Sequence, residues 1–409
     1  MSDRVSRRAV VAGVAATAGA ALLKKVQAEV PLAVASAQQA TQEPAVGAGT
    51  SATSARSAFE SPARAPVGVV TGASFTPLHQ LTGTITPNDL VFERHHSGIP
   101  TIDPRRYKLM LHGLVDRPLV FTLADLRRLP SVSRVYFIEC SGNGRSAYRS
   151  PKPDMTPQQV DGMTSNGEWT GVPLAVMLRQ AGVRRDARWL LAEGGDAAKL
   201  SRSIPMEKAL DDAMIAYAFN GEPLRPAHGY PARLFLPGYE ANTCIKWLRR
   251  LEVIAEPNMS KDETSRYTDP LPNGTARMFS FVMDAKSIIT HPAHPSRLEP
   301  GWHEIGGIAW SGRGRITRVD VSVDGGREWT PTTLQDPALP KAHTRFHLMW
   351  KWDGVPTTIM SRASDETGYV QPTRAAFIQK RGPGTDYHFN CIRAWNVARD
   401  GLVTFAVDA

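Results

Sequence analysis

The stretch YFIECSGNGRS, Tyr136–Ser146, contains an abrupt change of pattern. Its apolar start predicts a buried strand, and the Ser-Gly-Asn-Gly run predicts a tight turn. Cys140 stands where the strand ends, and Arg145 follows five residues later. Backbone N–H groups in such a turn, together with the arginine, are expected to lower the thiol pKa and favour the thiolate. From these residues alone, Cys140 is an inert buried thiol, a nucleophile or a metal ligand.

The chain as a whole has 409 residues, enough for two or more domains. Its net charge of +9 comes from 48 basic and 39 acidic residues spread along the sequence, which indicates anionic substrates or an acidic partner. No nucleic-acid-binding motif is present. Three cysteines, Cys140, Cys244 and Cys391, are too few for a disulfide framework. Without CxxC or CxxCH, we expect no structural zinc and no covalently attached c-type haem.

Residues 1–37 are predicted to be an export signal. Arg7 and Arg8 directly precede an Ala/Gly-rich apolar run that is too short and mild to span a membrane, and Ala35-Ser36-Ala37 is a candidate cleavage site. An ordinary secretory signal or a frayed helix is the alternative. The arginine pair favours the twin-arginine route, which exports folded proteins. We therefore expect a periplasmic protein whose cofactor is inserted before export.

The rest of the chain divides into three parts by composition and periodicity. Residues 38–75 are rich in Ala, Ser, Thr, Pro and Gly and predict a flexible tether. Residues 76–270 mix strands with short helices, one of them capped by Thr122 and one ended by Gly182, and predict an α+β domain. Residues 271–409 alternate apolar and polar positions around turns such as Asp324-Gly325-Gly326. They predict an immunoglobulin-like β-sandwich.

Several segments, taken in order, resemble the sulfite oxidase family of molybdenum enzymes. They are ECSGNGRS at Glu139–Ser146, FERHH at Phe92–His96, EGGD at Glu193–Asp196, and a long block from Ala216 to Val253 that contains HGYPAR and CIKW. Any one of these motifs is weak, whereas several in order are specific. The resemblance covers nearly all of the chain after the tether. It implies a molybdopterin-binding α+β domain, a C-terminal immunoglobulin-like dimerisation domain and a molybdenum centre on one molybdopterin.

The resemblance also assigns roles to individual residues. Cys140 would bind molybdenum through its thiolate. Arg94 and Arg145 would supply positive charge to a sulfur oxyanion, and Tyr267 would lie near the reacting oxygen. In this assignment Cys244 belongs to a cofactor-holding stretch without being a second metal ligand. The implied cofactor-binding residues are Phe92, Arg94, His96, Asp196, His228, Arg233, Cys244, Ile245 and Lys246.

The chain departs from the family pattern near its end. Animal members carry a substrate-contacting arginine there, whereas this sequence has Asn396 and Val397, with Arg393 close by but out of register. We therefore expect a more open or differently charged anion pocket. No haem domain is recognised, so electrons are expected to leave through a partner chain.

Within the family the chain most resembles the molybdenum subunit of sulfane dehydrogenases. That resemblance implies a dihaem c-type cytochrome partner, a sulfur-carrier protein as substrate in thiosulfate oxidation, and a homodimer. A sulfite dehydrogenase acting on free sulfite is the nearest alternative. A methionine-sulfoxide-type reductase and a non-catalytic binding module that has lost its metal are further alternatives.

Overall fold

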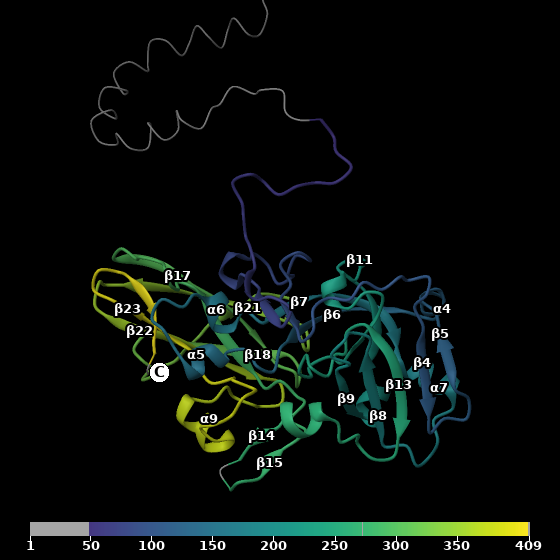
Figure 1. Ribbon diagram of the computed structural model, residues 1–409. Coiled ribbons are helices and arrows are strands. Elements are labelled where there is room, and N and C mark those ends of the chain that lie inside the picture. The colour runs from purple at the N-terminus through teal and green to yellow at the C-terminus, as the bar shows by residue number, and fades with distance from the viewer. Residues whose placement is uncertain (1–48, 272, 408–409) are drawn as a thin grey trace, which may run out of the picture. The chain divides into compact units, whose positions relative to one another are not determined.

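The structure is a computed structural model that describes residues 49–271 and 273–407 (Figure 1). The predicted twin-arginine signal at residues 1–37 lies outside them. The chain divides after Ser61 into two units, and every element below belongs to the second, which begins at Pro62. None of the helices in the described ranges has the length and apolar character needed to cross a membrane.

The first part of this unit is built on two five-stranded sheets. In the first sheet the order is β5-β4-β13-β8-β9, with β4 and β13 parallel and the other neighbours antiparallel. Its strands are β4 (Leu109–Gly113), β5 (Leu119–Phe121), β8 (Trp189–Gly194), β9 (Ser201–Pro205) and β13 (Leu248–Ile254). The second sheet contains β6 (Val132–Glu139), β7 (Thr164–Pro173), β10 (Met214–Phe219), β11 (Glu222–Pro223) and β12 (Arg233–Phe235). Apolar side chains from both sheets form one core.

Short helices connect these strands, as an α+β domain requires. Thr122 and Asp125 form a capping box at the start of α4, and Gly182 ends α7 in a left-handed conformation, so both predicted signals are confirmed. The helices are α4 (Leu123–Arg128), α5 (Arg145–Arg149), α6 (Pro157–Asp161), α7 (Leu174–Ala181) and α8 (Met206–Asp211), with short turns η1 (Leu78–Gln80), η2 (Pro226–His228) and the π-helical η3 (Asp262–Arg266).

Part of the segment predicted to be a tether is folded. Strands β1 (Ala65–Gly68) and β2 (Gly72–Phe75) form a hairpin, and β2 pairs with β3 (Glu93–His95) in a three-stranded antiparallel sheet. The small residues that suggested a tether permit the close turn between Gly68 and Gly72, where added side-chain carbons would meet backbone at 2.5 Å. Ordered structure therefore begins before the predicted boundary at residue 76.

The second part is an immunoglobulin-like β-sandwich, as the sequence predicts. One sheet runs β16-β17-β21-β20 and the other β19-β18-β22-β23-β24. The strands are β16 (Lys286–His291), β17 (Gly301–Trp310), β18 (Ile316–Ser322), β19 (Thr330–Pro331), β20 (Thr333–Leu334), β21 (Thr344–Trp352), β22 (Thr357–Asp365), β23 (Ala394–Val397) and β24 (Val403–Phe405). The predicted hairpin is confirmed by the pairing of Val321 with Thr330. Helix α9 (Arg374–Arg381) and the hairpin β14 (Asp269–Pro270) and β15 (Ala276–Arg277) were not predicted.

Strand β6 contributes to both parts of the unit. Because side chains alternate along a strand, Ile138 enters the core of the first part, whereas Phe137 packs with the β-sandwich core. The ring of Phe137 lies 6.5 Å from that of Trp310. The next residue, Glu139, accepts hydrogen bonds from Trp310 Nε1 at 2.7 Å and from Lys286 Nζ at 3.1 Å. The two parts are thus joined along the strand that ends at Cys140.

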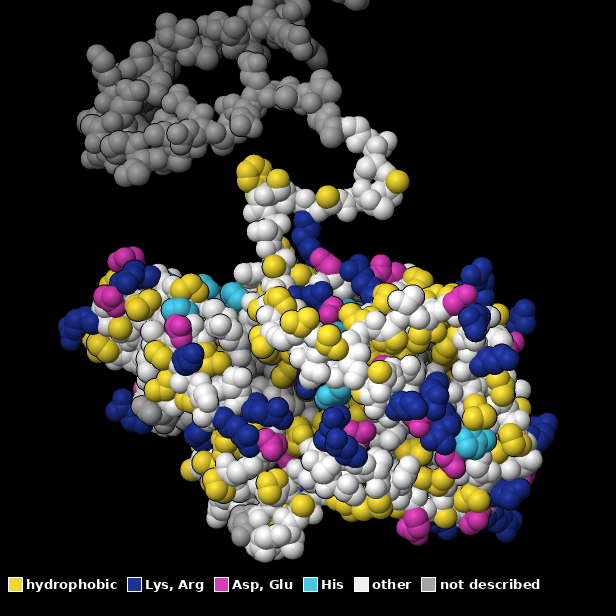
Figure 2. Space-filling model, viewed as in Figure 1, with side chains coloured by type: hydrophobic (Ala, Val, Ile, Leu, Met, Phe, Trp, Pro, Cys, Tyr) yellow, Lys and Arg dark blue, Asp and Glu magenta, His cyan; other side chains and the backbone are white. Residues whose placement is uncertain are grey.

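The molecular surface carries both signs of charge. Figure 2 shows basic side chains spread over the visible face and interspersed with acidic ones. This distribution agrees with the sequence, in which the excess of basic residues is not collected into long blocks.

Candidate active site

Cys140 lies at the end of β6, where the chain leaves the sheet for a tight loop. Its N–H donates to the carbonyl of Met163 at 3.0 Å, and its own carbonyl accepts from Asn143 N at 2.9 Å. Asn143 Nδ2 also donates to the Glu139 carboxylate at 2.9 Å. The loop is therefore fixed on both sides of the cysteine, whose side chain borders a cavity.

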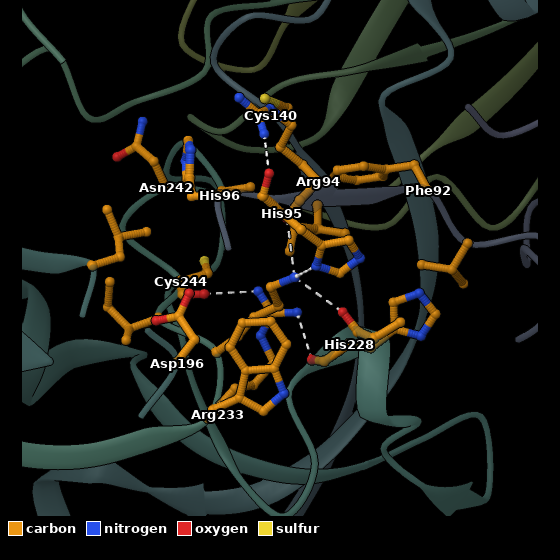
Figure 3. A pocket seen from close by; sticks show the side chains of 18 of the residues that line it. Phe92, Arg94, His95, His96, Cys140, Asp196, His228, Arg233, Asn242 and Cys244 are labelled. Atoms are coloured by element: carbon orange, nitrogen blue, oxygen red, sulfur yellow. Dashed lines mark hydrogen bonds between the residues drawn. The ribbon is translucent and has the colours of Figure 1, made fainter. Parts of the chain in front are cut away.

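Nearly all of the predicted site residues come together around that cavity. Figure 3 shows Cys140 close to Arg94, with His228 and Arg233 farther along the cavity. The predicted residues that line it are Phe92, Arg94, His96, Cys140, Asp196, His228, Arg233, Cys244, Ile245, Lys246 and Tyr267. They come from segments up to 175 residues apart, since Phe92 and Tyr267 border the same space. Arg145 is the one predicted residue that does not line it.

One end of the cavity holds buried cations and unpaired polar atoms. Arg233 donates to the carbonyls of His228 at 3.0 Å and Cys244 at 2.8 Å, yet its Nε atom has no hydrogen-bond partner among the described residues. His228 Nε2 is likewise buried and unpaired there. Burial, with Lys246 and Arg233 nearby, lowers the pKa of His228 to about 3, so the ring is neutral. Unpaired buried donors are costly, and an anionic group would satisfy them.

Lys246 holds this end of the cavity in place. Its Nζ lies 3.0 Å from the carbonyls of Arg94 and Ala227 and 2.9 Å from His95 Nδ1. Burial lowers the Lys246 pKa well below its usual value, and nearby Arg233 acts in the same direction. A phosphate bound here would oppose this shift and keep the amine charged.

The other end of the cavity surrounds the cysteine. His96 Nε2 and the Tyr267 hydroxyl lie 2.9 Å apart, within hydrogen-bond distance. Burial, together with Arg94 and Arg266, lowers the pKa of His96 to about 4. Burial also raises the pKa of Tyr267, so this phenol keeps its proton at neutral pH. The pair is therefore an uncharged hydrogen-bonding unit beside a permanently charged arginine, Arg94.

The expected lowering of the Cys140 pKa is not what the protein alone produces. Burial raises the pKa of this thiol, and the N–H of Gly142 with Arg94 and Arg145 offset the rise only in part. The desolvation of a thiolate raises the pKa by more than these groups lower it. The sequence-based prediction of a lowered Cys140 pKa was therefore wrong. A bound metal cation would supply the missing stabilisation, since it binds the thiolate directly.

Arg145 lies beside the cavity and does not reach into it. Its guanidinium donates to the carbonyl of Asp386 at 2.7 Å and lies over the Tyr387 ring, 5.1 Å from the centroid. The Tyr387 ring in turn packs 5.4 Å from Tyr267. The loop glycine Gly142 makes room for this arginine, because an added carbon would lie 3.0 Å from its NH2 atom.

The C-terminal segment that departs from the family pattern does not line the cavity. Arg393 is buried, with Nε 3.3 Å from the Asp161 carboxylate and NH2 donating to the carbonyl of Phe389. Val397 belongs to the β-sandwich core, and the Asn396 side chain accepts from Thr358. These positions therefore do not explain a more open or differently charged pocket, which the sequence had led us to expect.

Several lining residues were missed by the sequence analysis. They are Val91, His95, Ile138, Trp169, Leu200, Ala227, Ala241, Asn242 and Trp247. His95 and Trp247 are next to predicted residues in the chain, so this adjacency was the available signal. Asn242 carried none, because its role depends on distant partners: Nδ2 donates to Ser141 Oγ at 3.0 Å and Oδ1 accepts from Arg202.

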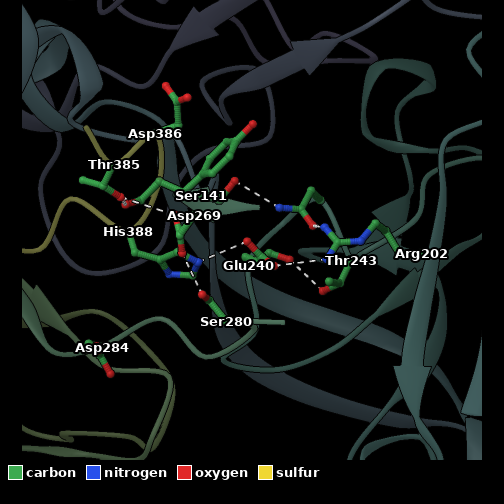
Figure 4. Close-up of polar contacts among 12 residues, drawn as sticks. Ser141, Arg202, Glu240, Thr243, Asp269, Ser280, Asp284, Thr385, Asp386 and His388 are labelled. Carbon is green, nitrogen blue, oxygen red and sulfur yellow. Dashed lines mark hydrogen bonds and ion pairs between the residues drawn. The ribbon is translucent and has the colours of Figure 1, made fainter. Parts of the chain in front are cut away.

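A buried polar network supports the cysteine end of the cavity. Figure 4 shows Glu240 between Arg202 and His388. Arg202 Nε donates to Glu263 at 3.1 Å and its NH2 to Glu240 at 3.5 Å. The Arg202 guanidinium also lies over the Tyr267 ring, 4.8 Å from the centroid. Arg202 is fully buried, so it is a structural cation that positions Tyr267.

The donor set fits a metal held mostly by a cofactor. Within residues 49–271 and 273–407, no three His, Cys, Asp or Glu side chains are grouped so that they could hold a metal ion. Cys140 would then be the single protein ligand. The unpaired atoms of His228 and Arg233 and the basic lining match an anionic, phosphate-bearing cofactor.

Comparison with known proteins defines the class. The family model for the oxidoreductase molybdopterin binding domain matches residues 96–261, and that for the Mo-co oxidoreductase dimerisation domain matches residues 277–391. The chain is therefore a molybdopterin-dependent oxidoreductase with the domain arrangement that the sequence predicts.

Individual relatives show the family to which the chain belongs. The chain is similar to sulfite oxidase of Gallus gallus, with 31% identity over 72% of this chain and 69% of that protein. It is also similar to mitochondrial sulfite oxidase of Mus musculus, with 32% identity over 72% of this chain and 59% of that protein. The solved structure of the sulfane dehydrogenase SoxCD from Paracoccus pantotrophus aligns with a TM-score of 0.86. Its identity is 47%, over 90% of this chain and 97% of that one. The chain belongs to the sulfite oxidase family.

Proposed function

We propose that this chain is the molybdenum subunit of a periplasmic sulfane dehydrogenase. It would oxidise sulfane sulfur bound to a carrier protein during thiosulfate oxidation and pass the electrons to a c-type cytochrome. The observation that carries the proposal is the similarity to the SoxCD structure, which extends over 97% of that chain at 47% identity. The cavity at Cys140 is consistent with it, because nearly every residue that the family resemblance implies lines that space.

The residues divide into those that would hold the cofactor and those that would meet the substrate. His228, Arg233 and Lys246 would bind the phosphate of molybdopterin, since Arg233 presents an unpaired Nε and His228 an unpaired Nε2. Asp196 lines the same space. The Cys140 thiolate would ligate the metal. When bound, the molybdenum centre supplies two-electron oxidation of sulfur with oxygen from water.

The groups at the cysteine end would orient the substrate. Arg94 offers a permanent positive charge to a developing sulfur oxyanion. Tyr267 holds its proton and can donate it to a substrate oxygen when His96 Nε2, 2.9 Å away, is the donor to the phenol oxygen. Arg145 is separated from Tyr267 by the Tyr387 ring and would act on the substrate only through this aromatic contact.

Partners and location follow from the same proposal. A dihaem c-type cytochrome would remove electrons one at a time, and the match to the dimerisation domain at residues 277–391 supports a homodimer. Export of the folded, cofactor-loaded chain would use the arginine pair Arg7-Arg8. A sulfite dehydrogenase acting on free sulfite is a second candidate, because the chain also matches sulfite oxidases at 31–32% identity.

The decisive experiment compares substrates on the exported, cofactor-loaded protein with a cytochrome c acceptor. We expect turnover with a thiosulfate-loaded carrier protein to exceed turnover with free sulfite. Preference for free sulfite would replace the first proposal with the second. Cys140→Ser should keep the fold and the pterin but lose turnover, and full activity in that variant would refute the ligand assignment.

A further inference from the structure

A second basic cavity lies apart from the active site, between the β14–β15 hairpin and helix α9. It measures about 290 Å³ and shares no lining residue with the cavity at Cys140. Its lining residues are Arg277, Phe279, Ser280, Val282, Asp284, Arg313, Lys380 and Arg381. We propose that this cavity binds a tetrahedral oxyanion with two negative charges, such as sulfate or phosphate. The proposal is independent of the substrate proposed above.

The charge balance of the cavity supports a dianion. Four cations line it, whereas Asp284 is its single lining carboxylate. That carboxylate accepts from Arg313 at 2.6 Å and from Arg381 at 3.1 Å. Across the described part of the chain, Arg277 and Lys380 have no ion pair with a carboxylate. Even when the nearby Asp269 is counted, two positive charges remain uncompensated.

A buried donor provides a second, independent observation. Arg381 is 5% exposed, and its NH1 atom has no hydrogen-bond partner in the ranges that the structure describes. The nearest acidic oxygen, Asp269 Oδ2, is 3.6 Å away and already accepts from Ser280 at 2.8 Å (Figure 4). A buried guanidinium nitrogen without a hydrogen-bond partner is costly, and the planar fork of arginine suits the oxygens of sulfate or phosphate.

The cations come from segments that are separate in sequence. Arg277 is on β15 and pairs with Asp269 of β14 in the strand register. Asp269 is only two residues after Tyr267 in the chain. Lys380 and Arg381 end α9 in the β-sandwich part of the chain. A shared anion would therefore tie the segment after an active-site tyrosine to the C-terminal domain, and would reduce local opening of the hairpin.

Titration calorimetry on the cofactor-loaded, full-length protein tests the proposal. Sodium sulfate is titrated at constant ionic strength, with sodium chloride as the reference anion. We expect one saturable sulfate site that Arg277→Gln and Lys380→Gln each weaken about tenfold or more, as is usual for a lost charge-assisted contact. Arg399→Gln and Lys351→Gln remove the same charges from exposed positions outside the cavity and should change the affinity less than twofold.

Two further comparisons identify the binding site and the class of anion that it recognises. Sulfate bound instead near Cys140 would keep its affinity in Lys380→Gln and lose it in Arg94→Gln, which would overturn the proposal. Equal affinity for sulfate and acetate would also overturn it, because the cavity would then recognise a carboxylate. In the wild type, sulfate should protect amides of η3 and β15 from hydrogen exchange, and this protection should be absent in Lys380→Gln.

Discussion

Replacing Lys286 with methionine should separate the cysteine loop from the β-sandwich that supports it. Lys286 begins β16, is 1% exposed, and places its Nζ 3.1 Å from Glu139 and 2.5 Å from Asp161. Asp161 retains Arg393 at 3.3 Å, and Glu139 retains Trp310 Nε1 at 2.7 Å. The variant therefore leaves a buried pair of carboxylates with one cation where the wild type has two.

The size of the effect follows from burial. Removing one partner from a buried ion pair costs about 3–5 kcal/mol, because the remaining charge stays desolvated without compensation. The Trp310 and Asn143 contacts to Glu139 place the expected loss toward the lower end, about 3 kcal/mol of unfolding free energy. Adding Glu139→Gln should restore part of this loss, since it removes the unpaired charge. A coupling of roughly 1–3 kcal/mol between the two substitutions is then expected.

Urea unfolding followed by circular dichroism, with molybdenum content measured in parallel, checks this reasoning. Lys341→Met is the matched control, because its 2.6 Å pair with Asp212 is partly exposed and should cost about 1 kcal/mol or less. We expect Lys286→Met to lower both stability and metal retention, because Glu139 precedes Cys140. If Lys286→Met and Lys341→Met are equally stable and both retain molybdenum, the buried cluster does not hold the loop.

The remaining predictions concern three buried positions. Gly144→Ala should lower the free energy of unfolding by about 2–4 kcal/mol, because φ is +87° at this position and the new carbon would lie 2.4 Å from a buried guanidinium nitrogen. Gly83→Ala is the control, since φ there is +67° and no neighbour lies within 4 Å. It should cost only about 1 kcal/mol in the same urea assay. Burial lowers the pKa of His343 to about 3. Below pH 6.5 the unfolded chain therefore binds a proton at this position, whereas the folded chain binds it only near pH 3. The free energy of unfolding should fall by about 2 kcal/mol from pH 7 to pH 5, and His343→Gln should flatten that slope. Arg202→Lys keeps the charge but loses the planar fork, so it should lower both the urea midpoint and turnover, whereas wild-type kinetics would show that Arg202 does not position Tyr267.

Local patterns were enough to predict the elements that depend on neighbours in the chain. The capping box at Thr122, the glycine that ends α7 at Gly182 and the turn after Val323 are each determined within a few residues, and all three are present. Along β21, the alternation of apolar and polar positions leaves Phe346 and Trp352 buried, whereas Leu348 and Trp350 on the same face are half-buried. The composition rule failed at β1 and β2, because small residues serve a close hairpin as well as a flexible segment.

The site was predicted as a set of residues, but its contacts were not. Cys140 and Lys246 could be placed in one site because their segments resemble a known family. The Arg145 side chain points toward Asp386, a contact across 241 residues that no local rule gives. The Cys140 pKa also depends on a balance between burial and nearby charge, and burial cannot be read from a turn motif.

The C-terminal domain is part of the active site's support. The backbone N–H of His388 donates to the carbonyl of Ser141 at 2.8 Å, and the ring Nε2 of His388 lies 3.3 Å from the Glu240 carboxylate. Lys286 reaches the Glu139 carboxylate on the other side of the cysteine. Both flanks of Cys140 are therefore held by residues more than a hundred positions later in the chain. Because these contacts are buried, the first domain alone would expose unpaired charges and lose the geometry of the cysteine loop.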